Sequence, residues 1–241
     1  MAEGLKVVAA ALESGATVES LYLAPEGRGQ PAVAALAEAA LSAGARVFDL
    51  GPGIMEKVAD TVTPQPVCAV VEMRHRPLEE VVSAGGEQAE RLIVCCVAVR
   101  DPGNLGAILR SAAAAGADGL VCCEGTADPY NPKTVRASAG SIFELPLSVR
   151  EPAEAALEAL RRAGFKRIAT RARGGVDYAL ADLDGDVALV LGNEASGLAP
   201  ELAGGFEEEV TIPMARRTES LNVAMTATIL CHEVARRRRL R

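Results

Sequence analysis

Three short segments of the chain combine glycines, small polar side chains and isolated charges in a way that suits binding of a polar ligand. They are Asp101–Arg110 (DPGNLGAILR), Leu189–Leu198 (LVLGNEASGL) and Ile212–Asn222 (IPMARRTESLN). The third leads from a strand-like sequence into an apolar helix, and the N-terminus of a helix leaves backbone N–H donors unsatisfied. We therefore expect a turn here that binds a polar ligand.

Each polar side chain in these segments also has a purely structural interpretation. Asn104 lies where a helix N-cap belongs, Glu194 could cap the turn that follows it, and Ser220 could cap the last helix. Arg110 is a single charge in an otherwise apolar helix, so it is either an ordinary surface residue or a functional one. The residues alone leave these alternatives open.

The composition predicts one large domain or two modest ones, with a core built from Ala, Val and Leu. Apolar residues make up 49% of the 241 residues, aromatic residues only 3%, and tryptophan is absent. No apolar run reaches the ~20 residues that span a bilayer, and the first residues lack the pattern of a signal peptide. The six cysteines show no metal-ligand spacing, which predicts buried reduced thiols, no metal site and a cytoplasmic location.

Alternating apolar strands and helices predict an α/β fold. Continuous apolar strands separated by helices indicate a mostly parallel sheet with helices on both faces. A polar stretch at 75–91 predicts a linker between domains at 1–74 and 92–241. The expected strands are 20–24, 46–50, 67–72, 92–98, 119–123, 167–170, 187–191 and 209–212, and the expected helices are 6–14, 31–44, 53–59, 104–115, 133–139, 152–163 and 220–238.

The overall charge is mild evidence against a nucleic-acid partner. Residues 1–90 carry six Lys/Arg and thirteen Asp/Glu, a net charge of −7, whereas residues 91–241 carry nineteen of each. Proteins that bind RNA usually neutralise its phosphates. Basic residues nevertheless cluster locally, at 74/76, 171/173, 216/217 and 236–239.

In their order and spacing, the three segments closely resemble the three motifs of the SpoU (TrmH-type) RNA ribose 2′-O-methyltransferases of the SPOUT superfamily. The resemblance covers about residues 90–238. It implies a C-terminal trefoil knot, which departs from the rule that chains do not thread loops. It also implies S-adenosylmethionine as cofactor and a homodimer. Residues 1–74 more loosely resemble the L30e-like RNA-recognition domain of these enzymes, in which an earlier helix and strand are expected ahead of Glu3.

The resemblance also assigns roles to individual residues. The expected catalytic residues are Asn104, Arg110, Glu194, Ser220 and Asn222. The expected cofactor contacts are Thr170, Arg171, Ala172, Leu191, Gly192, Asn193, Gly197, Ile212, Pro213, Met214, Ser220, Leu221 and Asn222. The expected RNA contacts are Lys133, Arg136 and Ser138. Because arginine hardly ever loses its proton, we expect Arg110 to hold the phosphate of the target nucleotide and stabilise the developing alkoxide.

The substrate that the resemblance implies is 23S ribosomal RNA, including the branch in which methylation gives antibiotic resistance. The alternative is tRNA. A catalytically inactive RNA-binding protein of the same fold should have lost at least one of the five catalytic residues, and all five are present. A Rossmann-type oxidoreductase is rejected because no GxGxxG segment follows a strand. Nothing in the sequence pairs with His75 or His232, so we expect no catalytic role for either.

Overall fold

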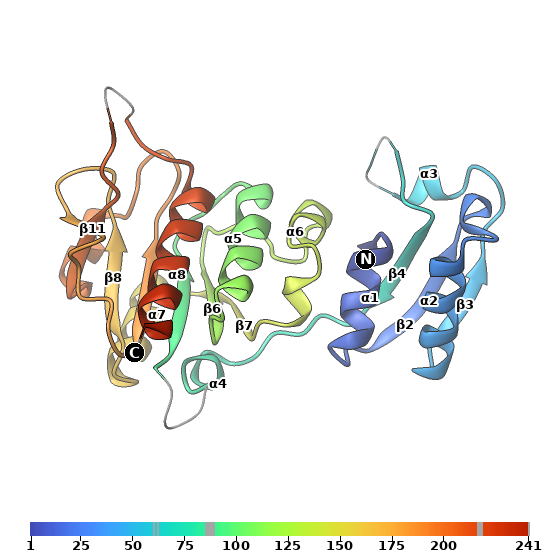
Figure 1. Cartoon of the computed structure of the whole chain (residues 1–241), viewed down its shortest axis with the longest axis horizontal. Helices are drawn as coiled ribbons and strands as arrows, with labels where there is room; N and C mark the ends of the chain where they lie inside the picture. The colour runs from blue at the N-terminus through green and yellow to red at the C-terminus, as the bar shows by residue number, and fades with distance from the viewer. Residues whose placement is uncertain (60, 62, 85–89, 216–218, 241) are drawn as a thin grey trace.

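The computed structural model describes residues 1–59, 61, 63–84, 90–215 and 219–240, which form two α/β units, each built on its own sheet (Figure 1). The sheet of the first unit has the strand order β1-β4-β2-β3. Strands β2 and β3 are parallel, and β4 runs antiparallel to both β1 and β2. The bounds are β1 Ala2–Glu3, α1 Leu5–Glu13, β2 Val18–Leu23, α2 Pro31–Ser42, β3 Arg46–Asp49, α3 Met55–Val58 and β4 Val67–Val71.

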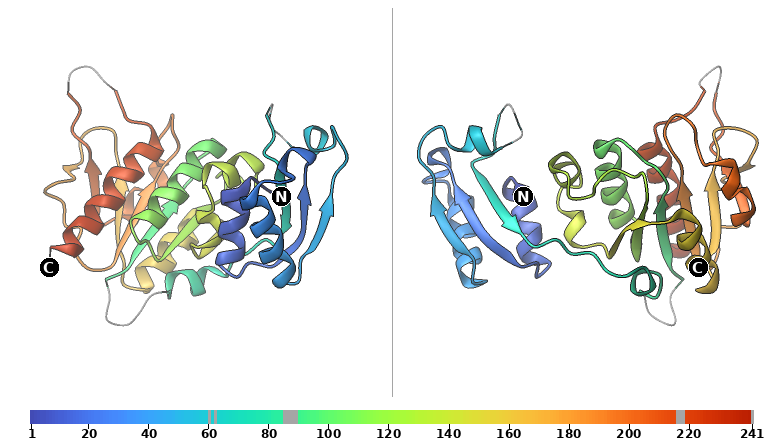
Figure 2. Two further views of the ribbon diagram at one scale, coloured as in Figure 1. Left: turned by 45° about the vertical axis from the view of Figure 1, so that its right-hand side comes forward. Right: turned by 180° about the vertical axis from the view of Figure 1, so that it is seen from behind.

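Helices α1 and α2 cover one face of this first sheet. Val8 of α1 and Leu36 of α2 are buried in one cluster with Leu21 of β2. The opposite face is covered in part: Met55 of α3 packs against Cys68 of β4, and Thr61 donates a hydrogen bond of 2.8 Å to the carboxylate of Glu3 in β1. Seen from behind, the strands stand in front of α1 and α2 (Figure 2).

The second unit is built on seven strands that are all parallel, in the order β7-β6-β5-β10-β8-β11-β9. Helices α5, α6 and α8 cover one face, and α4 and α7 cover the other. The predicted parallel α/β sheet is confirmed, while the trefoil knot stays a prediction. The bounds are α4 Leu78–Val82, β5 Leu92–Cys96, α5 Pro102–Ala114, β6 Gly119–Cys123, α6 Pro132–Ala137, β7 Leu147–Glu151, α7 Ala153–Arg162, β8 Lys166–Thr170, β9 Val176–Asp177, β10 Val187–Leu191, β11 Glu208–Thr211 and α8 Val223–Arg239.

The central strands are apolar throughout because both of their faces are buried. In β5, Val94 packs into the cluster under α5 and α8, whereas Ile93 packs into the cluster under α4 and α7. All six cysteines are buried and free of disulfide bonds, as the sequence predicts. Burial raises the pKa of the Cys231 thiol to about 12, which keeps it protonated and unreactive.

Part of the predicted linker 75–91 is folded onto the second unit. Leu78, Val81 and Val82 of α4 are buried, and the helix packs against β6, β7 and α7. The helix is too short for an apolar period to stand out among the surrounding polar residues, so the sequence did not predict it. No helix in the described part of the chain is long and apolar enough to cross a membrane.

Candidate functional site

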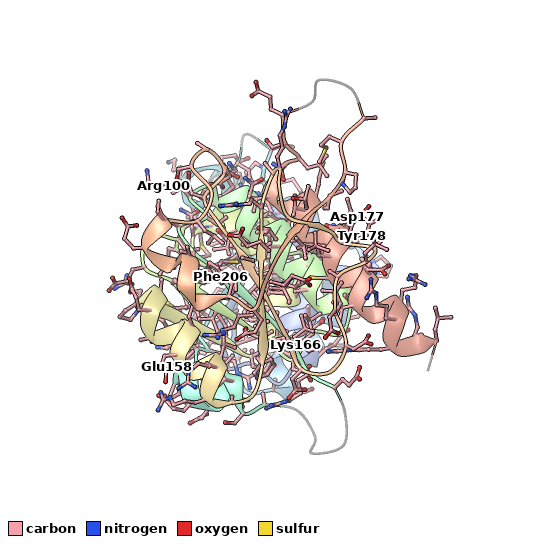
Figure 3. All side chains as sticks on the ribbon, turned by 90° about the vertical axis from the view of Figure 1, so that its left-hand side faces the viewer. Arg100, Glu158, Lys166, Asp177, Tyr178 and Phe206 are labelled. Carbon is pink, nitrogen blue, oxygen red and sulfur yellow. The ribbon has the colours of Figure 1, made fainter. Side chains whose placement is uncertain are left out.

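Loops that leave the carboxyl ends of neighbouring parallel strands form a pocket of about 530 Å³ at one end of the larger sheet. In open α/β sheets this is where ligands bind, and the volume suits a small molecule. Figure 3 views the sheet from the β9 side, with Phe206, which lines the pocket, labelled. The predicted cofactor residues that line the pocket are Thr170, Arg171, Ala172, Gly192, Asn193, Gly197, Ile212, Met214, Ser220 and Leu221; Leu191, Pro213 and Asn222 do not line it.

The loop after β10 is closed by its own hydrogen bonds. Asn193 and Gly197 exchange backbone hydrogen bonds of 3.0 and 2.9 Å, and the Asn193 side-chain oxygen accepts from the N–H of Ala195 at 3.0 Å. A Cβ atom at Gly192 would lie 2.5 Å from the carbonyl carbon of Gly197. Only glycine therefore fits at this position, and the loop is a tight wall of the pocket.

The same loop is tied to the loop after β5 through the carboxylate of Glu194. This carboxylate accepts hydrogen bonds from the backbone N–H groups of Arg100 at 3.2 Å and Asp101 at 3.1 Å, and from Asn104 Nδ2 at 3.0 Å. Burial by itself would raise the pKa of Glu194, but these hydrogen bonds outweigh it and hold the pKa below its ordinary value. Glu194 is therefore an anion that fastens two loops together.

Asn104 extends this connection to the third predicted segment. Its side-chain oxygen accepts a hydrogen bond from Asn222 Nδ2 at 2.9 Å, and Asn222 Oδ1 accepts from the N–H of Ala224 at 2.8 Å. Glu194, Asn104 and Asn222 thus form a continuous chain of hydrogen bonds, which we call the amide relay. It brings three of the five predicted catalytic residues together, one from each segment.

Two helix caps differ from the sequence prediction. Helix α5 is capped by Asp101, whose carboxylate accepts from the N–H of Asn104 at 2.8 Å, and α8 is capped by Asn222 rather than by Ser220. Pro102 occupies the first turn of α5, a position typical of proline, and so moves the cap ahead of it. The sequence prediction missed Asp101, although an Asp-Pro pair is a recognisable helix start.

The loop before α5 carries a strained residue. Ala98 has φ 55°, in the left-handed region that non-glycine residues seldom adopt. Its carbonyl accepts a hydrogen bond from Asn193 Nδ2 at 2.9 Å. The loop after β10 therefore helps to hold this backbone in place as well.

Ser220 and Arg110 stand apart from the amide relay. Ser220 is exposed and lines the pocket. Arg110 is exposed on α5, about 9 Å along the helix from Asn104, at the usual rise per residue. Within the described part of the chain, the Arg110 side chain makes no hydrogen bond or ion pair to another residue. Its guanidinium group is therefore available to a ligand.

The three predicted RNA contacts lie on or just after α6, with different surroundings. Lys133 pairs with the carboxylate of Asp101 at 2.9 Å, and Arg136 lies 3.5 Å from the carboxylate of Glu3 in the first unit. Ser138 is fully buried and donates to the carbonyl of Val135, so it has no exposed surface to offer to RNA. The predicted basic pair Arg216/Arg217 lies outside the described residues.

Neither histidine belongs to the amide relay. The ring of His75 lies near that of Tyr130, with centroids 6.3 Å apart, and His232 is exposed on α8. In the described ranges, no group of three or more His, Cys, Asp or Glu residues could hold a metal ion.

Two family models match the chain and divide it between the two units. Residues 91–232 match the SpoU rRNA Methylase family, and residues 1–77 match the model described as RNA 2′-O ribose methyltransferase substrate binding. The match to the larger unit contains all three segments from which the amide relay is built.

Individual relatives agree with the family models. The chain is 33% identical over 232 residues to the 23S rRNA (guanosine(2553)-2′-O)-methyltransferase RlmP of Bacillus subtilis, covering 96% of this chain and 86% of that one. It is 37% identical over 190 residues to a 23S rRNA (uridine(2479)-2′-O)-methyltransferase of Streptomyces viridochromogenes, covering 77% of this chain and 65% of that one.

A solved structure matches the fold of nearly the whole chain. The crystal structure of an AdoMet-bound rRNA methyltransferase from Sinorhizobium meliloti has a TM-score of 0.84 and 35% identity, covering 98% of this chain and 86% of that one. On its sequence, its fold and its three motif loops, the chain belongs to the SpoU rRNA methylase family.

Proposed function

We propose that this protein transfers a methyl group from S-adenosylmethionine to the 2′-hydroxyl of a ribose in RNA, and that this RNA is 23S ribosomal RNA. The observation that carries the proposal is the amide relay. It joins the three family motifs beside a pocket of cofactor size. The RNA named for both curated relatives is 23S ribosomal RNA, with tRNA as the alternative substrate.

The pocket suits S-adenosylmethionine in size and chemistry. The tight wall at Gly192–Gly197 allows a ligand to approach the backbone closely, and Ile212 and Leu221 offer apolar surface. We assign cofactor binding to the loops at 192–197 and 212–222, with Thr170–Ala172 completing the site. When bound, S-adenosylmethionine supplies a methyl group that its sulfonium already activates.

With the methyl group activated, the main task of the protein is to orient the ribose. Glu194 is a poor proton acceptor because its pKa is lowered and its oxygens already accept hydrogen bonds. We therefore assign Glu194 a positioning role that fixes the amide of Asn104. Arg110, exposed and available, would hold the phosphate beside the target ribose and stabilise charge on its 2′-oxygen.

The proposed substrate is tested by mapping ribose methylation in the RNA of cells with and without the gene. Purified protein with methyl-labelled S-adenosylmethionine is then offered 23S rRNA, 16S rRNA and tRNA from the deleted strain. We expect one 23S position to lose its methyl group in the deleted strain and to regain it in the purified reaction. Transfer to tRNA alone would favour the alternative, and transfer to no RNA would overturn the proposal. An rRNA substrate would place the reaction in the cytoplasm.

We also propose a homodimer, because apolar side chains are exposed beside α8. Met225, in the first turn of α8, is 60% exposed, and Leu180 is 81% exposed. Leu180 lies in the loop whose carbonyls bind Arg237 of α8. Burial of such side chains in a subunit interface is favourable.

A further inference from the structure

The face of the first sheet that α1 and α2 leave uncovered carries an unusual row of side chains. The strand register places Glu3, Cys68, Tyr22 and Phe48 side by side across β1, β4, β2 and β3. Residues directly opposite one another in neighbouring strands share a face of the sheet. The row therefore runs across the whole sheet. It is covered by α3 at Cys68 and by Thr61 and Gln65, which hydrogen-bond the Glu3 carboxylate, so its open part lies at β3.

Two aromatic rings stack in this row, and one of them faces solvent. The rings of Tyr22 and Phe48 are stacked with centroids 5.4 Å apart and planes at 19°. Phe48 is 41% exposed, and it is the one exposed ring among the chain's seven aromatic residues, all of which the structure describes. An exposed aromatic ring that lies beside a second, stacked ring is an arrangement on which an RNA base stacks.

A positive charge lies next to the rings on the edge strand β3. The guanidinium carbon of Arg46 lies over the Phe48 ring, 5.9 Å from its centroid and on the same face of β3, so Arg46 moves aside when a base stacks on that side of the ring. Arg46 pairs with Glu19, but both side chains are more than 60% exposed. An ion pair this exposed contributes little stability, so Arg46 can exchange Glu19 for a phosphate at small cost.

The far end of the row leads to the active-site loops. Glu3 lies 3.5 Å from Arg136 on α6, and Lys133 on the same helix pairs with Asp101, which caps α5. Three strand spacings, about 14 Å, separate β3 from β1. A single strand of a few nucleotides that starts at the open part of the row on β3 would therefore span the distance to α6, and from there to the amide relay.

We propose that the open part of this sheet face, at β3, is a base-stacking platform for single-stranded RNA, with one base on Phe48 and a neighbouring phosphate on Arg46. This rests on the proposed function, because the RNA is the substrate of the same enzyme. The platform selects an unpaired segment, since a base within a duplex already stacks on its neighbours and cannot lie flat on the ring.

The test uses the full chain and a fluorescein-labelled 12-nucleotide single-stranded RNA of mixed sequence, followed by fluorescence anisotropy. We expect Phe48→Ala to weaken binding about tenfold, as loss of one base–aromatic stack does. Phe48→Trp should bind at least as tightly as the wild type, whereas Phe48→Leu, which stays apolar but has no ring face, should bind like Phe48→Ala. Leu41→Ala is the matched control, because Leu41 is 59% exposed and lies on α2, the helix that covers the opposite face of the sheet. It should bind as the wild type does.

Calorimetric binding of S-adenosylmethionine, unchanged in every variant, shows that the second unit remains folded. Unchanged RNA affinity in Phe48→Ala would overturn the platform, and so would equal affinity of the wild type for the duplex form of the probe. A change of oligomeric state without a change in RNA affinity would show that the face contacts protein, and would also overturn it.

Methylation of RNA by the wild type distinguishes a failure of the platform from a failure of the proposed function. Active wild type together with unchanged probe binding by Phe48→Ala would overturn the platform alone. Inactive wild type together with weakened probe binding would overturn the proposed function and leave the platform supported.

Discussion

The side-chain amide of Asn104 donates a hydrogen bond of 3.0 Å to the carboxylate of Glu194, a residue ninety positions further along the chain. Asn104 lies in the first turn of α5, which follows β5, and Glu194 lies in the loop after β10; the two strands are adjacent and parallel. Because Glu194 also binds backbone N–H groups beside Asn104, it fixes both the loop and the direction in which the amide of Asn104 points.

Replacing Glu194 with glutamine should therefore disturb catalysis more than folding. The new amide nitrogen would face a backbone N–H donor, and leaving one such donor unsatisfied costs about 1–3 kcal/mol. We expect Glu194→Gln to lower kcat roughly tenfold to a hundredfold, measured as methyl transfer to RNA. Glu201→Gln, on an exposed position near the pocket, is the control and should retain activity. Full activity in Glu194→Gln would show that the carboxylate is not needed for positioning.

Arg110→Ala should abolish methyl transfer while S-adenosylmethionine affinity stays within a few-fold of the wild type. An interaction made mainly in the transition state is lost as turnover without loss of ligand binding. Single-turnover methylation and calorimetry measure the two quantities, and Arg110→Lys tests how far charge alone suffices. Loss of cofactor binding in Arg110→Ala would instead make the role of Arg110 structural.

Gly192→Ala should abolish cofactor binding. The added methyl group would lie 2.5 Å from backbone at Gly197, so the wall of the pocket must open. Gly204→Ala is the matched control, because a Cβ there meets nothing within 4 Å. Calorimetry with S-adenosylmethionine should show no binding to the first variant and normal binding to the second. Normal binding by Gly192→Ala would mean that the loop yields at little cost.

The C-terminal helix should contribute stability that is lost at low pH. A hydrogen bond from Arg236 lowers the pKa of Glu233, and burial of the carboxylate opposes this effect. With a further hydrogen bond from Arg237, the pKa falls from 4.5 to about 2. A lowered pKa in the folded state gives stability that is fully present above pH 4.5 and is lost as the pH falls towards 2. Glu233→Gln should therefore reduce the free energy of unfolding by about 2 kcal/mol at pH 7.

Urea unfolding at pH 7, 4 and 3 measures this contribution. The difference between the wild type and Glu233→Gln should narrow at pH 4 and narrow further at pH 3. Glu38→Gln, on the exposed side of α2, should match the wild type at each pH. A difference that stays constant with pH would contradict the role given to the ion pairs.

Met225→Glu should dissociate the proposed dimer, because it would place a charge in an apolar interface. Light scattering should give a monomer of 24.9 kDa for this variant and twice that mass for the wild type at micromolar concentration. Met73→Glu is the control, since Met73 is 62% exposed, close to the 60% of Met225. A wild-type monomer would contradict the dimer.

The sequence predicted the central strands well because they are buried on both faces. β5 and β10 are unbroken apolar runs, and short runs of this kind are typical of parallel strands that helices cover on both sides. β7 was missed because an edge strand carries polar residues such as Ser148 and Arg150, which hide the pattern. β1 is only two residues long and offers no pattern at all.

The site residues were predictable by type but not by their connections. Asp101 and Asn104 both suit a helix cap, and only the position of Pro102 decides between them. The hydrogen bond between Asn104 and Asn222 spans 118 positions. It depends on α5 and α8 packing side by side, which no local pattern records.

The place of β10 in the sheet also sets the order in which the chain can fold. β10 lies between β5 and β8, yet it is synthesised after both of them. Until Val187–Leu191 leaves the ribosome, two apolar strands each present an unpaired edge. The nascent chain therefore carries the sheet β7-β6-β5 and an unpartnered β8, a condition that invites aggregation or chaperone binding, until β10 joins them. The methyltransferase site is complete only after β11 and the segment ahead of α8 have followed.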